Sequence, residues 1–266
     1  MTHQPGGRSP LLFGVTVIVT LFTLIPIVVS IMAGIVNNYN VGLRSGLTLR
    51  WLSEVWSVYG STVGFSMGLA LACVAITTVL GVPCAYALAR NRSRWARTFE
   101  EVLTLPIAIP GLATALALIL VYGQITMLRQ SAAFILIGHV VFTLPFMVRT
   151  VAASFQRPEL TAIEEAARTL GASFPRRFLG VLVPSVFPAI VAGMLMVFTL
   201  SIGEFNLTWM LHTPFTRTLP VGLADSYASM RIEVGSAYTL IFLLVVLPML
   251  WLLQAASTLI QKRYGQ

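Results

Sequence analysis

The sequence predicts an all-α integral membrane protein. Its six transmembrane helices are expected to form a single membrane domain over residues 11–266. Composition is the first reason: 57% of the 266 residues are hydrophobic and 10% are charged, whereas soluble proteins carry about 25% charged residues. The second reason is a series of long apolar runs separated by short polar segments. The third is a content of 20 glycines and 14 prolines, which would disrupt soluble helices but which membrane helices tolerate.

The first apolar run and the loop after it set the start of the domain. The run 11–36 is long enough to cross a bilayer with some tilt. It is too long for the apolar core of a signal peptide, so we expect it to remain uncleaved. A polar loop, 37–59, follows, and its two tryptophans, Trp51 and Trp56, are typical of a membrane–water interface.

Two of the later spans carry pairs of prolines. Pro106 and Pro110 stand four apart in the third span, and Pro184 and Pro188 do so in the fifth. A proline removes a helical hydrogen bond, so it kinks or breaks the helix, and the freed carbonyls need partners in protein or water. We therefore expect the third span to be kinked or broken and packed inside the bundle, and the prolines of the fifth span to lie at a similar depth. The predicted spans after the first are 61–88, 102–122, 131–148, 179–202 and 234–260.

The distribution of positive charge predicts the orientation. Loops rich in Lys and Arg face the cytoplasm, so the polar tail 1–10, the C-terminus and the loop after the fourth span are predicted to be cytoplasmic. The arginines between residues 90 and 97 fit this anchoring role, and we exclude nucleic acid as a partner despite the net charge of +8. Of the 17 Lys and Arg residues, those in the predicted outer segments are Arg44, Arg50, Arg129, Arg217 and Arg231.

The loop between the fourth and fifth spans, residues 157–178, predicts a short amphipathic helix, a turn and a second helix that enters the membrane. Pro158 suits the first turn of a helix, and Glu164 and Arg168 stand four apart in an orientation that supports it. Gly171 follows, where a helix can end in a left-handed cap, and Ser173 can cap the second helix. Such a helix can dock into a groove of a soluble partner. Its apolar stripe consists of Leu160, Ile163, Ala167 and Leu170.

A spaced pattern in and after this loop resembles a known motif. It begins with Glu165–Ala167, continues with Gly171 and ends with Val181–Pro184. This pattern resembles the EAA loop of the membrane subunits, or permeases, of binding-protein-dependent type I ABC importers. The family has Ile and Leu where this chain has Val181 and Val183, and both replacements keep apolar bulk.

The resemblance implies that the loop forms coupling helices, which receive motion from an ATPase. It implies three kinds of protein partner in addition to the lipid bilayer: an ATP-binding subunit dimer, a second permease that is an identical or a related chain, and a periplasmic or lipid-anchored substrate-binding protein. It also implies location in the bacterial inner membrane. The residues that it assigns to ATPase coupling are Glu164, Glu165, Ala166, Ala167, Gly171 and Pro184.

The chain carries no sequence pattern for ATP hydrolysis. Its one lysine, Lys262, is followed by Arg263, whereas a P-loop needs a lysine that precedes Ser or Thr after a Gly-rich turn. ATP, with Mg, is therefore expected on the partner ATPase, and the chain is interpreted as a non-catalytic transport subunit without a cofactor or metal of its own. Cys73 and Cys84 lie too far apart along one helix for a disulfide.

Four residues are candidates for the translocation path or its gate. Glu204 ends the fifth span and is either a charged group at the outer mouth or a solvated carboxylate at a helix end. Phe205 and Asn206 follow it, in a segment interpreted as a re-entrant turn that faces the path. His139 lies in an apolar run; we predict a hydrogen-bonded interior residue, with a role in the path as the alternative.

The sequence narrows the substrate only to a few classes. Gly203–Phe205 followed by Thr218–Val221 resembles the subgroup of these permeases that imports spermidine or putrescine, 2-aminoethylphosphonate or ferric iron, and we favour the first two classes. The alternatives to an ABC permease are an ion-coupled secondary transporter and a membrane scaffold. No Asp, Glu, Lys or Arg lies in the middle of a predicted span, which disfavours the secondary transporter. The proline-broken spans disfavour a rigid scaffold.

Overall fold

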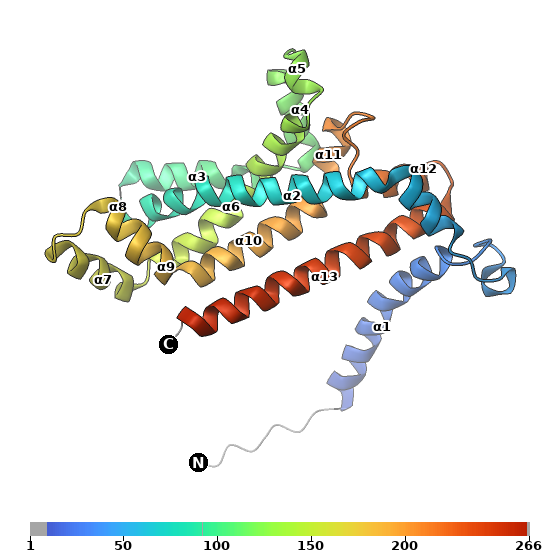
Figure 1. The fold of residues 1–266 in the computed structure, drawn as a ribbon, viewed down its shortest axis with the longest axis horizontal. Helices are drawn as coiled ribbons and strands as arrows, with labels where there is room; N and C mark the ends of the chain where they lie inside the picture. Colours follow the sequence, from blue (N-terminus) through green and yellow to red (C-terminus); the bar gives the residue numbers. More distant parts are fainter. Residues whose placement is uncertain (1–9, 92, 265–266) are drawn as a thin grey trace. The chain divides into compact units, whose positions relative to one another are not determined.

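The structure is a computed structural model that describes residues 10–91 and 93–264 (Figure 1). Within those residues all regular structure is helical, apart from one isolated bridge between Val36 and Leu47, so the predicted all-α class is confirmed. Residues 1–9 of the predicted tail lie outside the described residues. The elements are α1 (Pro10–Ala33), η1 (Gly42–Ser45), α2 (Arg50–Arg90), α3 (Arg94–Ala108), α4 (Gly111–Tyr122), α5 (Thr126–Arg129), α6 (Ala132–Phe155), α7 (Pro158–Thr169), α8 (Phe174–Arg177), η2 (Phe178–Leu182), α9 (Val183–Ser185), α10 (Phe187–Ile202), α11 (Asn206–Leu211), α12 (Leu219–Ala228) and α13 (Ile232–Tyr264).

Four of the described helices are long and apolar enough to cross a membrane, namely α1, α2, α6 and α13. Two bent helix pairs, α3 with α4 and α8–α9 with α10, raise the number of candidate spans to as many as six. The helices differ in extent from the predicted spans. Helix α2 begins at Arg50, so the second half of the predicted loop 37–59 is helical, and α6 continues beyond the predicted end of its span, Val148, to Phe155.

The first bend lies where the sequence predicts a broken helix. Helices α3 and α4 meet at 109°. Ile109 between them is extended (φ −87°, ψ 129°), because the residue before a proline, here Pro110, is disfavoured in the helical region. Pro106 lies in the last turn of α3, two residues before its end at Ala108. The two prolines therefore end one helix and redirect the next.

The second bend contains a feature that the prolines did not predict. The axis turns by 70° between Ser185 and Phe187, and Pro188 begins the following helix α10. Before the bend, η2 is a π-helical turn, directly followed by Pro184 in α9. Pro184 has no N–H to donate to the carbonyl of Gly180, and such freed groups favour local widening of the helix.

The chain divides into two compact units, which are described separately. The smaller unit comprises residues 1–60 and 222–244. In it, the chain just after α1 approaches the start of α13 closely, because a Cβ at Gly34 would lie 2.9 Å from backbone atoms of Ser236 and Ala237. The Trp51 indole N–H donates to the carbonyl of Val36 over 2.8 Å.

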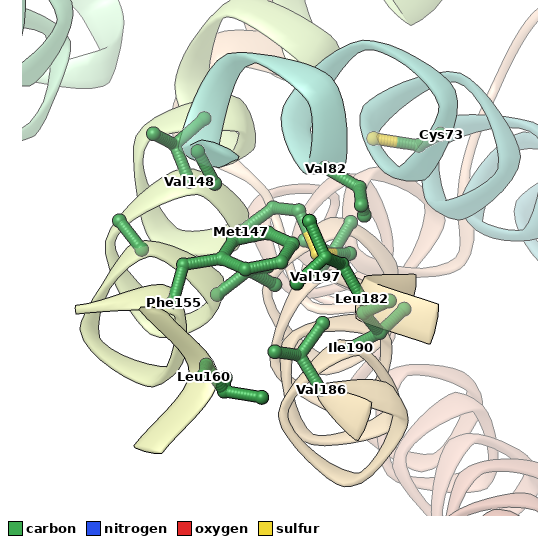
Figure 2. Packing of buried hydrophobic residues seen from close by; sticks show 13 residues of the cluster. Cys73, Val82, Met147, Val148, Phe155, Leu160, Leu182, Val186, Ile190 and Val197 are labelled. Atoms are coloured by element: carbon green, nitrogen blue, oxygen red, sulfur yellow. The ribbon is translucent and has the colours of Figure 1, made fainter. Parts of the chain in front are cut away.

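The larger unit comprises residues 61–221 and 245–266, and its main core lies between α2, α6, α7 and α10 (Figure 2). Met147 of α6 fills the space beside two glycines: a Cβ at Gly81 of α2 would lie 2.7 Å from its Cγ, and one at Gly193 of α10 would lie 2.6 Å from its Sδ. Small residues thus allow three helices to pack around one flexible side chain. The core consists of Cys73, Val82, Ala85, Met147, Val148, Val151, Ala152, Phe155, Leu160, Leu182, Val186, Ile190 and Val197.

A second core in the same unit packs α4 and α11 against α6. Gly138 of α6 makes this possible, because a Cβ there would lie 2.6 Å from Leu207 and 2.9 Å from Leu211. Cys73 is buried and Cys84 is half-buried, and both are free thiols. The candidate site residues of the sequence analysis lie in two regions of the larger unit, one at α7 and one at α11.

Candidate functional site

Helix α7 has the local structure that the sequence predicts. It begins after Arg157 with Pro158 in its first turn and ends at Thr169. Gly171 then adopts a left-handed conformation (φ +79°), its N–H donates to the carbonyl of Arg168 (3.0 Å), and the Ala172 N–H donates to that of Ala167 (3.1 Å). These two bonds form a Schellman cap, in which glycine is the least strained residue.

The apolar stripe of α7 is divided between the interior and the surface. Leu160 is buried in the main core, where it points toward Val186 (Figure 2). Ile163 is 43% exposed and Leu170 is 88% exposed. The stripe is thus not one buried face, since only its first residue anchors the helix and its end is open to a partner.

The two neighbouring glutamates of α7 have different surroundings. Glu165 is exposed, as is Ala166 beside it, and Ala167 is half-buried. Glu164 is turned inward, and its side chain is 13% exposed. The predicted support of Glu164 by Arg168 is wrong, because both carboxylate oxygens are taken by residues of α2, as described next.

Glu164 lies in a group of side chains that we call the α7 junction: Tyr86, Arg90, Phe155, Thr161 and Glu164. The Tyr86 hydroxyl donates to Glu164 Oε1 (2.5 Å), and Arg90 Nε donates to Glu164 Oε2 (2.8 Å). Arg90 Nη1 also donates to the carbonyl of Phe155 (2.7 Å) and to Thr161 Oγ1 (3.0 Å). One guanidinium therefore contacts the end of α6 and two residues of α7.

Aromatic rings extend the α7 junction toward the second half of the loop. The Tyr86 ring lies 5.6 Å from that of Phe155, 5.8 Å from Phe174 and 5.3 Å from Phe178. Edge-to-face contacts at these separations are favourable. The predicted side-chain cap from Ser173 is wrong, because Ser173 precedes α8 but its hydroxyl makes no capping bond.

The second region, the His139 cluster, consists of His139, Ser201, Glu204 and Thr208. His139 is fully buried, and its Nδ1 lies 2.8 Å from Ser201 Oγ while its Nε2 lies 2.8 Å from Thr208 Oγ1. The prediction of a hydrogen-bonded interior residue is thus confirmed. The cluster joins α6, α10 and α11 within an apolar bundle.

The hydrogen bonds of the His139 cluster can all run in one direction, from Ser201 through His139 and Thr208 to Glu204. The Thr208 hydroxyl donates to Glu204 Oε2 over 2.8 Å, and a hydroxyl has one hydrogen to donate. Thr208 therefore donates its single hydrogen to Glu204 and accepts from Nε2–H of His139. With a neutral ring, Nδ1 then accepts from the hydroxyl of Ser201. Each polar side-chain group of the four cluster residues thus has a hydrogen-bond partner, which makes the cluster a rigid connection.

Glu204 differs from one of its two sequence interpretations. Its side chain is 8% exposed, so it is not a solvated carboxylate. It accepts hydrogen bonds from the backbone N–H groups of Leu207 and Thr208, each over 2.8 Å, and so caps the start of α11. Its Oε2 lies 3.9 Å from His139 Nε2. The structure thus brings Glu204 and His139 together, while Asn206 is exposed and the Phe205 ring packs in a tilted arrangement against Trp209, with ring centroids 5.4 Å apart.

Sequence reasoning missed the partners in both regions. Tyr86 and Arg90 are one helical turn apart on α2, and Arg90 was interpreted only as part of a basic anchor. Ser201 and Thr208 flank Glu204 at spacings that give no signal by themselves. The available clue was a four-residue spacing that puts Tyr86 and Arg90 on one face of α2, but nothing local connects them to α7.

These features define a multi-pass helical membrane protein with a polar helix exposed beside its spans. Residues 77–265 match the family model described as "Binding-protein-dependent transport system inner membrane component", and the chain belongs to this family. It is a permease subunit of a type I ABC importer. This result excludes the secondary transporter and the scaffold as descriptions of the chain.

Curated relatives match over most of the chain. The putrescine transport system permease protein PotI of Escherichia coli K12 is 28% identical over 251 residues, which cover 91% of this chain and 89% of that protein. The putative 2-aminoethylphosphonate transport system permease protein PhnV of Salmonella paratyphi A is 28% identical over 272 residues, covering 99% and 98%. The molybdenum transport system permease protein ModB of Mycobacterium bovis is 28% identical over 195 residues, covering 68% and 72%.

A solved structure has the same fold. A chain from inward-facing conformations of the MetNI methionine ABC transporter superposes with a TM-score of 0.64. The similarity covers 80% of this chain and 99% of that chain at 18% sequence identity. The arrangement of helices described above is therefore that of an ABC permease.

Proposed function

We propose that this permease works in the bacterial inner membrane as one of two permease subunits, the other being an identical or a related chain. A dimer of ATP-binding subunits binds ATP with Mg and drives the permease pair. A periplasmic or lipid-anchored binding protein delivers the substrate. The observation that supports this most directly is α7: a short helix ended by a Schellman cap at Gly171, with Glu165 and Leu170 exposed.

The proposed topology has six spans and both termini in the cytoplasm. Each bent pair, α3 with α4 and α8–α9 with α10, counts as one broken span. The charge distribution supports this orientation, because it puts most Lys and Arg residues on the side of α7. Helix α7 then faces the compartment that contains ATP.

In the proposed mechanism, α7 receives motion when the ATPase dimer closes. The exposed carboxylate of Glu165 pairs with a cationic group of the ATPase, and Leu170 fills an apolar groove beside it. Gly171 keeps the turn that presents both residues. Pro184 lies in the first half of the broken span, so motion of α7 reaches α10 through a segment that is already bent.

The proposed translocation path passes the His139 cluster. Glu204, Phe205 and Asn206 stand at the start of α11, and His139 holds α11 to α6 through Thr208. In this proposal Glu204 and Asn206 face the substrate route when the gate opens, and His139 positions them without contacting substrate. A half-helix that ends beside a path is a common device in transporters.

We propose a small polar solute as substrate, either a polyamine or 2-aminoethylphosphonate. The names of PotI and PhnV point to these two classes, and both contain a primary amine that is protonated at neutral pH. The carboxylate of Glu204 complements such a cation. Uptake of labelled putrescine and of labelled 2-aminoethylphosphonate by the same reconstituted complex distinguishes the two, with molybdate as the anionic alternative.

Copurification tests the proposed assembly. The tagged chain is expressed with its neighbouring genes, extracted in mild detergent and analysed for an ATP-binding subunit. The same is done with Gly171→Val, which strains the left-handed position, and with Gly171→Asn, which tolerates it. We expect the ATPase to accompany the natural chain and the Asn variant, and to be lost or uncoupled in the Val variant. A natural chain that never retains an ATPase contradicts the proposal.

A further inference from the structure

One side chain, that of Arg90, joins helix α7 to the ends of two spans, α2 and α6. In the proposed topology these ends lie on the cytoplasmic side. Arg90 is the last residue of α2, and Phe155 is the last residue of α6. The guanidinium of Arg90 donates to the carbonyl of Phe155, to Thr161 Oγ1 and to Glu164 Oε2 at 2.7, 3.0 and 2.8 Å. A guanidinium offers several donors in a rigid planar fork and here bonds three acceptors, whereas a lysine ammonium is a compact point charge without that fork.

A second bond fixes the rotation of α7. Tyr86 donates its hydroxyl to Glu164 Oε1 at 2.5 Å, so the carboxylate is held from both sides by the last turn of α2. Leu160, on the same helix, is anchored in the main core. With Leu160 and Glu164 both fixed, α7 can neither roll about its axis nor tilt away from α2 without losing contacts.

The environment makes these bonds stronger than ordinary surface ion pairs. The side chains of Arg90 and Glu164 are 21% and 13% exposed, so water screens their attraction less than in an exposed pair. Hydrogen bonds that involve a charged donor or acceptor are about twice as strong as neutral ones. The opposite end of α7, by contrast, continues into the turn at Gly171, where a Cβ would meet no neighbour within 4 Å.

We propose that Arg90 is a positioning residue for energy coupling, which makes α7 move as one body with the ends of α2 and α6. A push on the exposed residues of α7 then displaces both spans, instead of being absorbed by rotation of a loosely attached helix. In this division of tasks Glu165 faces the partner and Glu164 holds the helix to its own subunit. This inference rests on the proposed coupling function of α7.

Reconstitution of the whole transporter tests the inference. Substrate uptake and ATP hydrolysis are measured on the same proteoliposomes, for the natural chain, Arg90→Gln, Arg90→Lys and Glu164→Gln. We expect the substrate taken up per ATP to fall by about tenfold in Arg90→Gln, within the range of measured coupling between sites. Arg90→Lys keeps the charge but not the three bonds, so it is expected to be impaired as well. Arg94→Gln removes an exposed arginine next to the same turn and serves as the matched control.

A distance measurement separates positioning from loss of stability. Spin labels are attached at Arg168→Cys on α7 and at Val79→Cys on α2, both exposed, in a chain with Cys73→Ala and Cys84→Ala. We expect one narrow distance distribution in the natural background and a broad one with Arg90→Gln or Glu164→Gln. Glu164→Gln is the milder change and remains informative if Arg90→Gln does not assemble.

The outcomes distinguish a failure of the role inferred for Arg90 from a failure of the proposed coupling function. A complex in which Arg90→Gln and Glu164→Gln keep both the natural uptake per ATP and the narrow distance overturns the role of Arg90. Failure of the natural chain to retain any ATPase contradicts the proposed function itself. Non-additive losses, in which the double variant Arg90→Gln with Glu164→Gln is no worse than Arg90→Gln alone, support the Arg90–Glu164 contact as the acting unit.

Discussion

The α7 junction and the His139 cluster both join helices with polar side chains, but by different physical means. The junction is partly exposed, joins a guanidinium to a carboxylate, and lies beside exposed residues of α7. The cluster is buried, joins two hydroxyls, an imidazole and the Glu204 carboxylate, and leaves none of its own polar groups unpaired. We infer that the cluster serves mainly to hold the fold, and that the junction serves mainly to transmit motion.

The largest expected effect on stability comes from breaking the His139 cluster on one side. His139→Ala leaves the hydroxyls of Ser201 and Thr208 without their partner in an apolar interior and also opens a cavity. We expect a loss of about 3 kcal/mol in the free energy of unfolding. The measurement is thermal or denaturant unfolding of the purified protein in detergent.

A control variant distinguishes lost hydrogen bonds from lost volume. His139→Phe combined with Ser201→Ala and Thr208→Val removes three of the four polar side chains of the cluster and refills the space, while Glu204 keeps the bonds from the backbone N–H groups of Leu207 and Thr208. Because replacing hydrogen-bonded partners together by apolar groups is close to neutral, this variant is expected to recover most of the stability. Equal destabilisation of the triple variant and His139→Ala would show that the hydrogen bonds are not what matters there.

The next effect tests the packing of the main core around Met147. Gly81→Val places a side chain where Met147 Cγ and Cβ already lie, at 2.7 and 3.3 Å from the position of a Cβ. Overpacking of this kind costs about 1–3 kcal/mol. Adding Met147→Ala makes room and is expected to restore part of the loss. Unfolding midpoints of the single and double variants, compared with Met147→Ala alone, check this.

A smaller effect on stability is expected at the turn after α7. Gly171→Val forces a β-branched residue to φ near +79°, which costs about 1–2 kcal/mol. Gly171→Asn costs less, because Asn is tolerated in this region. The comparison between regions predicts that Gly171→Val lowers uptake far more than it lowers the unfolding midpoint. Parallel losses of uptake and stability would remove the special role of the turn.

The smallest effect is expected at an exposed ion pair of the smaller unit. Arg231 pairs with Glu54, and their side chains are 43% and 31% exposed. Exposed pairs contribute about 0–1 kcal/mol, so Arg231→Gln is expected to change the unfolding midpoint little and uptake not at all. A loss of uptake as large as that of Arg90→Gln would show that the exposed Arg231–Glu54 pair affects transport as much as the Arg90–Glu164 pair. This result would contradict a special role of the α7 junction.

The sequence predicted the features that depend on local rules. The helical class, the breaks at Pro110 and Pro188, the Schellman glycine and the buried His139 all follow from composition, backbone sterics or polarity. The boundaries of these helices were predicted less well than their existence. Helix α2, for example, begins at Arg50, because tryptophans and a few polar residues do not by themselves prevent a helix.

The contacts that give the site its properties were not predictable. Arg90 and Glu164 are separated by 74 residues, and no periodicity connects them. Local spacing pointed to Arg168 as the partner of Glu164, but a half-buried carboxylate with two donors from α2 gains more than an exposed pair along one helix. Ser173 likewise has the right position for a cap but makes no capping bond.

The most direct test of the central claim is a cross-link from α7 to the ATPase. Leu170→Cys, at a site that is 88% exposed, and Phe215→Cys, 95% exposed on the loop after α11, are compared in a chain with Cys73→Ala and Cys84→Ala. In a complex that still takes up substrate, α7 as the coupling helix predicts a permease–ATPase cross-link from Leu170→Cys whose yield changes when ATP is added, and none from Phe215→Cys. An active complex in which Leu170→Cys gives no such cross-link, with or without ATP, would contradict the claim.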